Sequence, residues 1–480
     1  MRSTTHSSAS PPQNKWLAML GIGMGVLMFT IDTSAVNIVL PTLVQTLQTT
    51  FATIQWVVLS YLLVITALVL GAARLGDMFG KKRLYLGGLV VFTISSMLCG
   101  LAPGVYSLIA FRGLQGLGAV FISALGAAII TEVFPDSERG RALGIIGAVV
   151  SLGVALGPTV GGLLIQIAGW RTIFWINVPI GIVATFIIIR FVPASRGSGA
   201  KQRFDALGAL IMTVTLTCFA LGMTDGQNQG FSSGTTITLL TTAAIGLACF
   251  LALEARIKQP MLDLRIFRNL QFSLSLLTGV LVFIVIAGII FILPFFLEWV
   301  LQYSTQQVGL LLAVSPILGG IIAPISGSLS DRFGPRIISL IGLVLMVIGC
   351  LLASTFDAQL TELGYIVRVA PFGLGLGMFQ SPNNSAIMGG VSREKLGIAS
   401  GLLSLTRTLG QTAGLPLLGA IFASLSLSNA NLAQHTDVKA APIEALVYGL
   451  QGTFHIAALI LCVAVLVTGV VWRMERRSSN

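Results

Sequence analysis

Long apolar stretches follow one another along almost the whole chain, separated by short polar connections. Each stretch runs for about 17 to 25 residues, the length that an α-helix needs to cross a bilayer. The pattern predicts an all-α integral membrane protein with 14 transmembrane helices. The helices are expected to begin near Trp16, Phe51, Leu84, Tyr106, Ala142, Thr172, Asp205, Thr236, Gln271, Gln306, Ile337, Glu362, Leu396 and Gly452.

A short charged pattern occurs twice, once in each half of the chain, between apolar stretches. The copies are Leu75–Arg83 and Leu329–Arg336, and both contain Leu-x-Asp-x-Phe-Gly with cations close behind. Many secondary transporters consist of two related halves with the substrate site between them. Eight predicted helices separate the copies, whereas two directly joined bundles of six would place six there. We therefore infer a duplicated transporter with two helices inserted centrally.

These inferences divide the chain into four parts. Residues 1–14 are rich in Ser and Thr and are expected to form a disordered cytoplasmic tail. An N-terminal six-helix bundle (15–195) follows. Next come a linker with the two inserted transmembrane helices (196–258) and a C-terminal six-helix bundle (259–480).

Composition and charge agree with a membrane protein. The chain is 55% hydrophobic and 9% charged, far below the roughly 25% charged residues of soluble domains. Lys and Arg outnumber Asp and Glu by 28 to 17, which in a soluble protein would suggest nucleic-acid binding. Here nearly all cations fall on the connections of one face, and only Arg171 and Lys439 fall on the other. This asymmetry predicts a multi-pass protein of the cytoplasmic membrane with both termini in the cytoplasm, and no nucleic-acid partner.

Two charged residues within apolar stretches are candidates for energy coupling. Asp32 lies inside the first predicted helix, where a carboxyl group is costly and therefore a functional candidate. It could bind and release a proton, or it could be satisfied by Thr33, Asn37 or an arginine and only hold helices together. Arg112, in the fourth helix, is the arginine expected to pair with Asp32. The alternative is that Arg112 extends to the nearby outer surface or bonds backbone carbonyls.

Two further patterns suggest moving parts. The fifth helix carries an unusual number of small residues with one proline: Gly153, Gly157, Pro158, Gly161 and Gly162. Such residues let helices approach closely and kink, so we predict close packing with a role in gating. The duplicated turn, with the following inner loop, is predicted to form a conformational latch on the inner face. Its residues are Asp77, Gly80, Arg83, Arg139, Arg141, Asp331 and Arg332.

Polar residues elsewhere in the spans are candidates for the wall of a substrate cavity. They could instead hydrogen-bond from helix to helix. They are Asn37, Gln115, Gln380, Asn383, Asn384, Arg407 and Gln411. No pattern predicts a metal site, a cofactor or catalytic residues, and the chain lacks the Gly-x-x-x-x-Gly-Lys-Ser/Thr loop of nucleotide-driven pumps.

Several of these stretches resemble the major facilitator superfamily, and within it the fourteen-helix drug:proton antiporter family. Leu75–Arg83 is similar to the inner-loop signature, Arg112–Gly116 to the fourth-helix signature and Gly153–Gly162 to the fifth-helix antiporter motif. Asp32–Asn37 with Leu40 and Pro41, Trp170–Gly181 and Pro260–Phe267 resemble further stretches of this branch. The resemblance covers nearly the whole chain and implies a major facilitator fold.

The resemblance further implies proton-driven export of amphipathic, often cationic molecules by alternating access, as in multidrug efflux and drug resistance. Asp32 and Arg112 would then couple export to the proton gradient. Two departures, Ala73 and Met78 in the inner-loop signature, predict a weaker latch. Helix ten lacks a carboxylate and helix thirteen carries Arg407, so we expect monovalent, neutral or anionic substrates.

Other functions remain open from the sequence alone. A dedicated exporter of one endogenous metabolite would use the same machinery. A membrane enzyme would need clustered nucleophiles, bases or carboxylates at one depth, and a sensor would need a domain to carry its output. The expected partners are a small-molecule substrate, protons and the lipid bilayer, and the sequence does not identify a periplasmic adaptor.

Overall fold

The computed structural model describes residues 14–194, 205–257, 264–389, 396–433 and 436–479. The predicted disordered tail, apart from Asn14, and the linker residues 196–204 lie outside the described residues. The same holds for a few side chains within helices, including that of Asp77.

Within the described residues, the first half consists of six long helices with two short ones at the connections. They are α1 (Lys15–Thr46), α2 (Phe51–Ile54), α3 (Trp56–Phe79), α4 (Lys81–Gly100), α5 (Val105–Val133), α6 (Asp136–Ala168), α7 (Thr172–Trp175) and α8 (Asn177–Phe191). Two further helices follow, α9 (Ala206–Gln229) and α10 (Gly234–Glu254). Gly80, with φ +94°, makes the sharp turn between α3 and α4, a backbone conformation that favours glycine.

The part of the second half that the structure describes also has six long helices. It begins with a short 3₁₀ turn, η1 (Leu264–Arg268), and with α11 (Leu270–Phe295), which continues as a π-helix, η2 (Phe296–Val300). Four long helices follow: α12 (Thr305–Phe333), α13 (Pro335–Ala353), α14 (Glu362–Gly389) and α15 (Leu396–Asn429). A short 3₁₀ turn, η4 (Val438–Ala440), precedes the last helix, α16 (Ile443–Ser479). The last helix begins before the predicted Gly452, because the residues ahead of that glycine are already helical.

Thirteen helices in the described part of the chain are long and apolar enough to cross a membrane. The remaining long helix, α14, has 28 residues and contains two prolines and the polar residues Gln380, Asn383 and Asn384. It packs along α13 and α12. Neighbouring helices therefore shield much of α14 from lipid, and it begins at Glu362, as predicted from the sequence.

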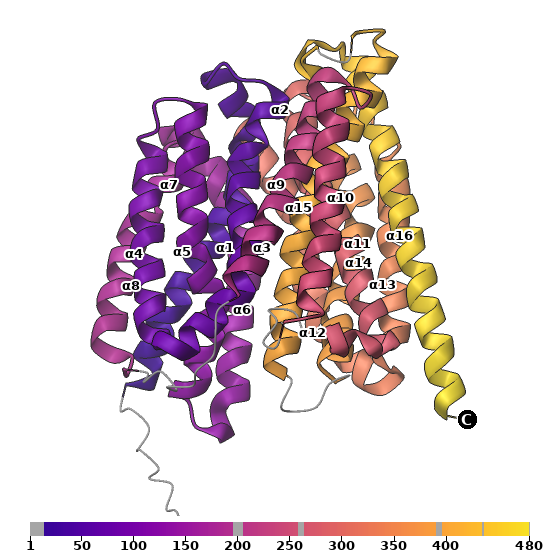
Figure 1. Cartoon of the computed structure of the whole chain (residues 1–480). Helices are drawn as coiled ribbons and strands as arrows, with labels where there is room; N and C mark the ends of the chain where they lie inside the picture. Colours follow the sequence, from indigo (N-terminus) through magenta and orange to yellow (C-terminus); the bar gives the residue numbers. More distant parts are fainter. Residues whose placement is uncertain (1–13, 195–204, 258–263, 390–395, 434–435, 480) are drawn as a thin grey trace, which may run out of the picture.

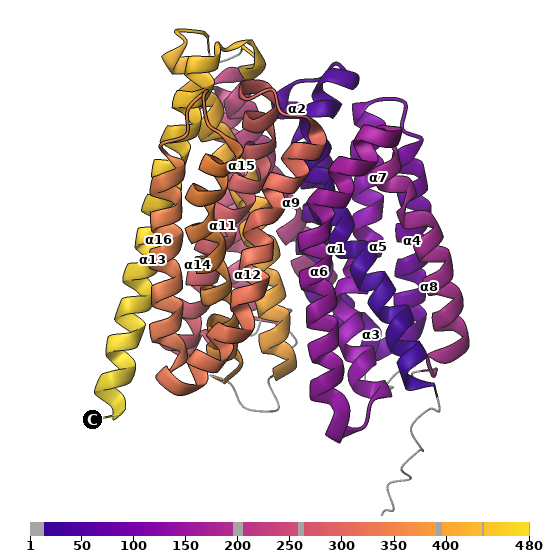
Figure 2. The ribbon, with the colours of Figure 1, turned by 180° about the vertical axis from the view of Figure 1, so that it is seen from behind.

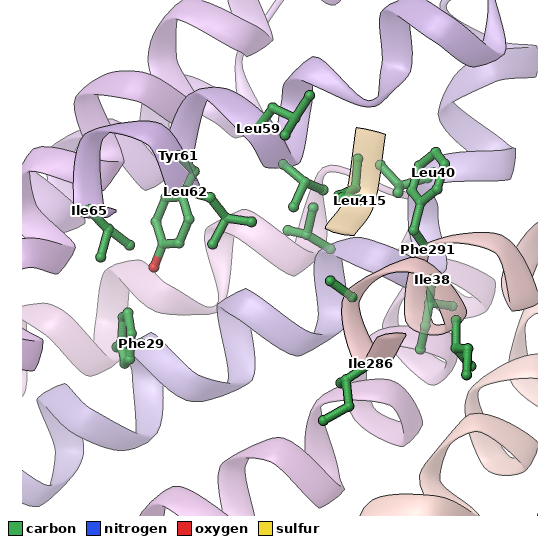
Figure 3. Close-up of a cluster of buried hydrophobic side chains, with 14 of the residues drawn as sticks. Phe29, Ile38, Leu40, Leu59, Tyr61, Leu62, Ile65, Ile286, Phe291 and Leu415 are labelled. Atoms are coloured by element: carbon green, nitrogen blue, oxygen red, sulfur yellow. The ribbon is translucent and has the colours of Figure 1, made fainter. Parts of the chain in front are cut away.

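The two halves lie side by side (Figures 1 and 2). The inserted helix α9 packs against α10 and also against α3 of the first half and α15 of the second. One cluster of buried apolar side chains extends through both halves. Figure 3 shows part of it, including Leu40 of α1, Phe291 of α11 and Leu415 of α15.

We call the end of the molecule that carries α2 the outer end, and the opposite end the inner end, after the predicted orientation. At the outer end, the ring of Phe51 inserts among four aromatic rings of the second half. Its centroid lies 5.1 Å from that of Phe291, 4.9 Å from Phe295, 6.3 Å from Trp299 and 5.7 Å from Phe422. We call this group of five rings the aromatic seal.

Hydrogen bonds beside the aromatic seal also join the halves. Gln55 is fully buried and donates to the side-chain oxygen of Gln227 in α9 at 2.8 Å. Gln227 in turn donates to the carbonyl oxygen of Pro416 in α15 at 3.4 Å. Nearer mid-membrane, the hydroxyl oxygens of Thr66 and Thr412 lie 3.0 Å apart. The inserted helix α9 therefore bridges both halves.

The halves diverge toward the inner end. Helices α6 and α12 are in tight contact at their outer portions, where Gly162 lies against Thr305 and Gly309. Toward the inner end, Gly144 and Gly147 of α6 and Gly320 of α12 face open space. The structure is thus closed at the outer end, where Figures 1 and 2 show the ribbons of the two halves closest to each other.

Candidate functional site

An ion pair lies in the interior of the first half. A terminal guanidinium nitrogen (Nη1) of Arg112 in α5 is 2.6 Å from Oδ2 of Asp32 in α1, and the two side chains are 1% and 0% exposed. The predicted partners are therefore brought together. Arg112 points across the bundle to Asp32, and its Nε also donates to the carbonyl oxygen of Val57 in α3 at 3.1 Å.

Two amide side chains complete the surroundings of the Asp32 carboxylate. Gln115 Nε2 and Asn177 Nδ2 each donate to Asp32 Oδ1 at 3.0 Å. Gln115 also donates to the hydroxyl of Ser96 in α4 at 2.6 Å. Helices α1, α4, α5 and α8 therefore meet around one carboxylate. We call Asp32, Ser96, Arg112, Gln115 and Asn177 the ion-pair cluster.

Aromatic rings cover the Arg112 guanidinium. Its central carbon lies 4.2 Å from the ring centroid of Tyr61 in α3 and 5.9 Å from that of Phe174 in α7. A cation over an aromatic face is stabilised by the ring quadrupole, more strongly when both are desolvated. Tyr61 is fully buried, and its hydroxyl lies 3.3 Å from that of Thr33.

This arrangement fits the ionised form of Asp32. Each of the three side chains that bond the carboxylate donates to it, and an ionised carboxylate only accepts. A proton on Asp32 would remove its charge and turn one accepting oxygen into a donor that faces other donors. Loss of the Asp32 charge would therefore weaken the contacts that join α1 to α5 and α8.

The glycines of α6 allow two other helices, α1 and α12, to pack closely against it. A Cβ atom at Gly153 or Gly157 would collide with Thr30 or Ser34 of α1, and one at Gly161 would lie 3.0 Å from Ala35. On the other side, a Cβ at Gly162 would lie 2.6 Å from the carbonyl oxygen of Thr305 in α12. The same helix therefore packs tightly on the ion-pair helix α1 and on the second half.

Gly162→Ala is expected to shift the protein away from the outer-closed state. The new methyl would press on the α12 backbone, and overpacking of this kind costs about 1–3 kcal/mol. The contact crosses the halves, so the fold of each half should be preserved. The shift can be measured as a longer distance between spin labels on cysteines at Gln48 and Gln359, after replacement of the five native cysteines.

Gly144→Ala is the matched control. Gly144 lies on the same helix, and a Cβ atom there would have no neighbour within 4 Å among the described residues. The label distances should stay as in the unsubstituted chain. Equal distances in both variants would contradict the assignment of Gly162 to the outer contact.

The predicted latch residues lie at the inner end. Arg83, Asp331 and Arg332 are exposed. Arg139 donates to the carbonyl oxygen of Phe134 at 3.2 Å, and Arg141 lies over the Trp16 ring at 5.4 Å. The Asp77 side chain lies outside the described residues, so its predicted pairing with Arg139 or Arg141 stays a prediction.

The first two cations after Gly80 have definite partners. Lys81 forms an ion pair with Glu132 of α5 at 2.5 Å. Lys82 donates to the carbonyl oxygens of Ile189 and Val192, at 3.0 Å and 2.5 Å, where α8 ends. These contacts tie the start of α4 to α5 and α8 within the first half.

The predicted cavity residues do not form one group. The prediction that Gln115 lines a substrate cavity is wrong. Gln115 is fully buried in the ion-pair cluster, because its amide reaches the Asp32 carboxylate. Asn37 donates to the Thr33 carbonyl of its own helix. Asn383 is buried, whereas Asn384 is exposed and Gln380, Arg407 and Gln411 are half-buried. Arg407 and Gln411 lie one turn apart on α15.

The sequence of the chain matches a known family along most of its length. The family profile of the Major Facilitator Superfamily matches residues 22–415 and 275–480. The chain belongs to the major facilitator superfamily. The all-α membrane fold predicted from the sequence is thereby confirmed, and this major facilitator protein is a membrane transporter by fold and family.

Relatives with assigned names include transporters of different kinds. The riboflavin transporter RibZ of Clostridioides difficile is 34% identical over 466 residues, which cover 97% of this chain and 99% of RibZ. The multidrug resistance protein Stp of Mycobacterium tuberculosis is 35% identical over 409 residues, covering 85% of this chain and 76% of Stp. A crystal structure of a bacterial homolog of the human lysosomal transporter Spinster, inward-facing and unoccupied, has a TM-score of 0.69 at 17% identity and covers 96% of this chain and 97% of its own.

Three residues in or beside the ion-pair cluster were not predicted from the sequence as members of a site. Asn177 was noted only as part of the stretch Trp170–Gly181, although an amide inside an apolar span is itself a signal. Ser96 and Tyr61 carry no such signal, because serine and tyrosine are common in spans. Their roles depend on contacts between helices that are distant in sequence.

Proposed function

We propose that this major facilitator transporter is a proton-coupled antiporter that exports amphipathic small molecules across the cytoplasmic membrane. The observation that carries the proposal is the buried ion pair of Asp32 and Arg112. A carboxyl group held there by donors from three side chains on two other helices can be charged in one state and protonated in another. Proton coupling requires a group of this kind.

In the proposed cycle, ionised Asp32 favours the outer-closed state, which takes up substrate from the cytoplasm or the inner leaflet. Opening at the outer end then releases the substrate and gives protons access to Asp32. Protonation weakens the contacts with Arg112, Gln115 and Asn177, and proton release to the cytoplasm restores them. The arrangement of α6 supports this cycle, because one helix contacts both α1 and α12.

A broad substrate range is favoured by the 35% identity to Stp, a protein named for multidrug resistance. A second candidate is a transporter of a single metabolite. The 34% identity to RibZ over nearly the full length of both chains favours it. Both candidates use the same coupling group, so they differ in the substrates that the protein accepts.

The test is energised efflux from a bacterium that lacks its own drug pumps. Cells with the unsubstituted chain should expel several unrelated lipophilic dyes, and a protonophore should abolish efflux. Asp32→Asn should reduce efflux to the level of empty cells, because asparagine cannot exchange a proton. Asp357→Asn is the matched control, since Asp357 is an exposed carboxylate in an outer loop.

Full protonophore-sensitive efflux by Asp32→Asn would overturn the coupling role. If the expressed protein expels none of the dyes but transports one metabolite, such as a flavin, against a proton gradient, the single-metabolite candidate replaces multidrug export.

A further inference from the structure

Arg407 is a cation in the second half that the coupling mechanism does not use. It lies on α15 within a membrane-spanning segment, Gly401–Asn429. Its side chain is half-buried, and within the described part of the chain it forms no hydrogen bond or ion pair. An unpaired guanidinium is costly in a membrane protein unless it faces a watery cavity or receives a partner.

The packing of α15 shows where Arg407 faces. Gly410 and Gly414 lie against the α11 backbone, and Thr412 contacts Thr66 of α3. Arg407 and Gln411, at i and i+4, share a face between these two contacts. Because the buried Thr412 meets α3, this stretch of α15 lies against the first half.

The charges at this place do not balance. Helix α3 packs against α15, which carries Arg407, and its Tyr61 covers the Arg112 guanidinium, so α3 lies between α15 and the ion-pair cluster. Asp32 and Arg112 compensate each other at 2.6 Å. Arg407 adds one positive charge for which the described residues here supply no carboxylate. Its charge would be best satisfied if an anion arrived from outside the protein.

We propose that Arg407 binds the acidic group of the substrate, so that the protein prefers amphipathic molecules carrying a carboxylate or a similar oxyanion. The guanidinium offers a planar set of donors that matches a carboxylate in a bidentate manner. Gln411, one turn away, supplies a further amide to the same ligand. This proposal rests on the proposed export function and names the substrate class of that site.

The test is equilibrium binding of two dyes with the same xanthene rings and opposite charge. Fluorescein is anionic, and tetramethylrhodamine methyl ester is cationic. Their fluorescence anisotropy is measured with the purified full chain in a neutral detergent. Arg407→Gln should weaken fluorescein binding about tenfold to a hundredfold, the loss expected for hydrogen bonds to a charged group. Rhodamine binding should stay the same or tighten.

Two variants control this experiment. Arg407→Lys keeps the positive charge and should retain more fluorescein affinity than Arg407→Gln. Arg368→Gln removes another half-buried cation of the second half, near the outer start of α14, and should leave fluorescein affinity unchanged. Elution as a single species in gel filtration verifies that each variant is folded.

The proposal is overturned if the unsubstituted protein does not bind fluorescein. It is also overturned if Arg407→Gln leaves fluorescein affinity unchanged or weakens both dyes equally. Because binding is measured without a proton gradient, the result is separate from the coupling test. Proton-coupled dye efflux with no effect of Arg407→Gln would leave the export function standing and remove only the charge preference.

Discussion

Replacement of Arg112 by alanine is expected to lower the free energy of unfolding by about 3–5 kcal/mol, because it leaves the Asp32 carboxylate buried without its cation. Both side chains are almost completely excluded from solvent, so water cannot take the place of the guanidinium. The contacts of Arg112 with Val57 and Tyr61 are lost as well. Unfolding of the purified protein in detergent measures the change, and dye efflux should be abolished.

The double variant Asp32→Asn/Arg112→Ala separates stability from coupling. It removes the negative charge together with the positive one, so much of the lost stability should return while efflux stays absent. Arg171→Ala is the control, because Arg171 is a cation at the outer surface that lies 4.3 Å from the Trp170 ring. It should cost only about 0.5–1 kcal/mol. A double variant as unstable as Arg112→Ala alone would show that the pairing of charges is not what stabilises this region.

Phe51→Ala is expected to open the outer end of the protein. Phe51 is 2% exposed and contacts four rings of the second half, so its removal leaves a cavity in the aromatic seal. Large-to-small changes of a buried phenylalanine cost about 3–5 kcal/mol. Here much of that cost should fall on the outer-closed state alone, because the contacts cross the halves. The distance between spin labels at Gln48 and Gln359 should increase, and efflux should fall.

The matched control is Tyr106→Ala. Tyr106 is an aromatic residue near the outer end of the first half, but it is 77% exposed. The label distance and efflux should both stay unchanged in this variant. If Phe51→Ala leaves the label distance unchanged, the aromatic seal does not hold the outer end closed. The hydrogen bonds of Gln55 and Gln227, together with the separate α6–α12 contact, would then keep it closed.

Much of the helical architecture could be predicted from the chain alone, for a simple reason. A helix needs about 20 apolar residues to cross a bilayer, so the length of each apolar stretch is itself structural information. Asp32 and Arg112 stood out by the same reasoning, since charges inside such stretches are costly. The prediction includes α14, which begins at Glu362 as expected, although its prolines and its polar residues Gln380, Asn383 and Asn384 make it less apolar than the other long helices.

Other features depended on which helices come together. Nothing in the chain distinguishes Phe51 from an apolar residue that faces lipid, yet it occupies the aromatic seal. Gln115 resembled a residue of a cavity wall and is instead a buried partner of Asp32. The bridging position of α9 also depends on packing, because its Gln227 meets Gln55 and Pro416, which are distant in sequence.

The membrane class, the duplicated halves with two inserted helices, and the charged candidates can therefore all be predicted from the chain, because the cost of polar groups in lipid is a property of local sequence. Three-dimensional packing brings four helices together at the ion-pair cluster, joins the halves at the outer end, and leaves Arg407 without a partner among the described residues. Those outcomes depend on the packing of helices that are far apart in the chain, which no local pattern specifies.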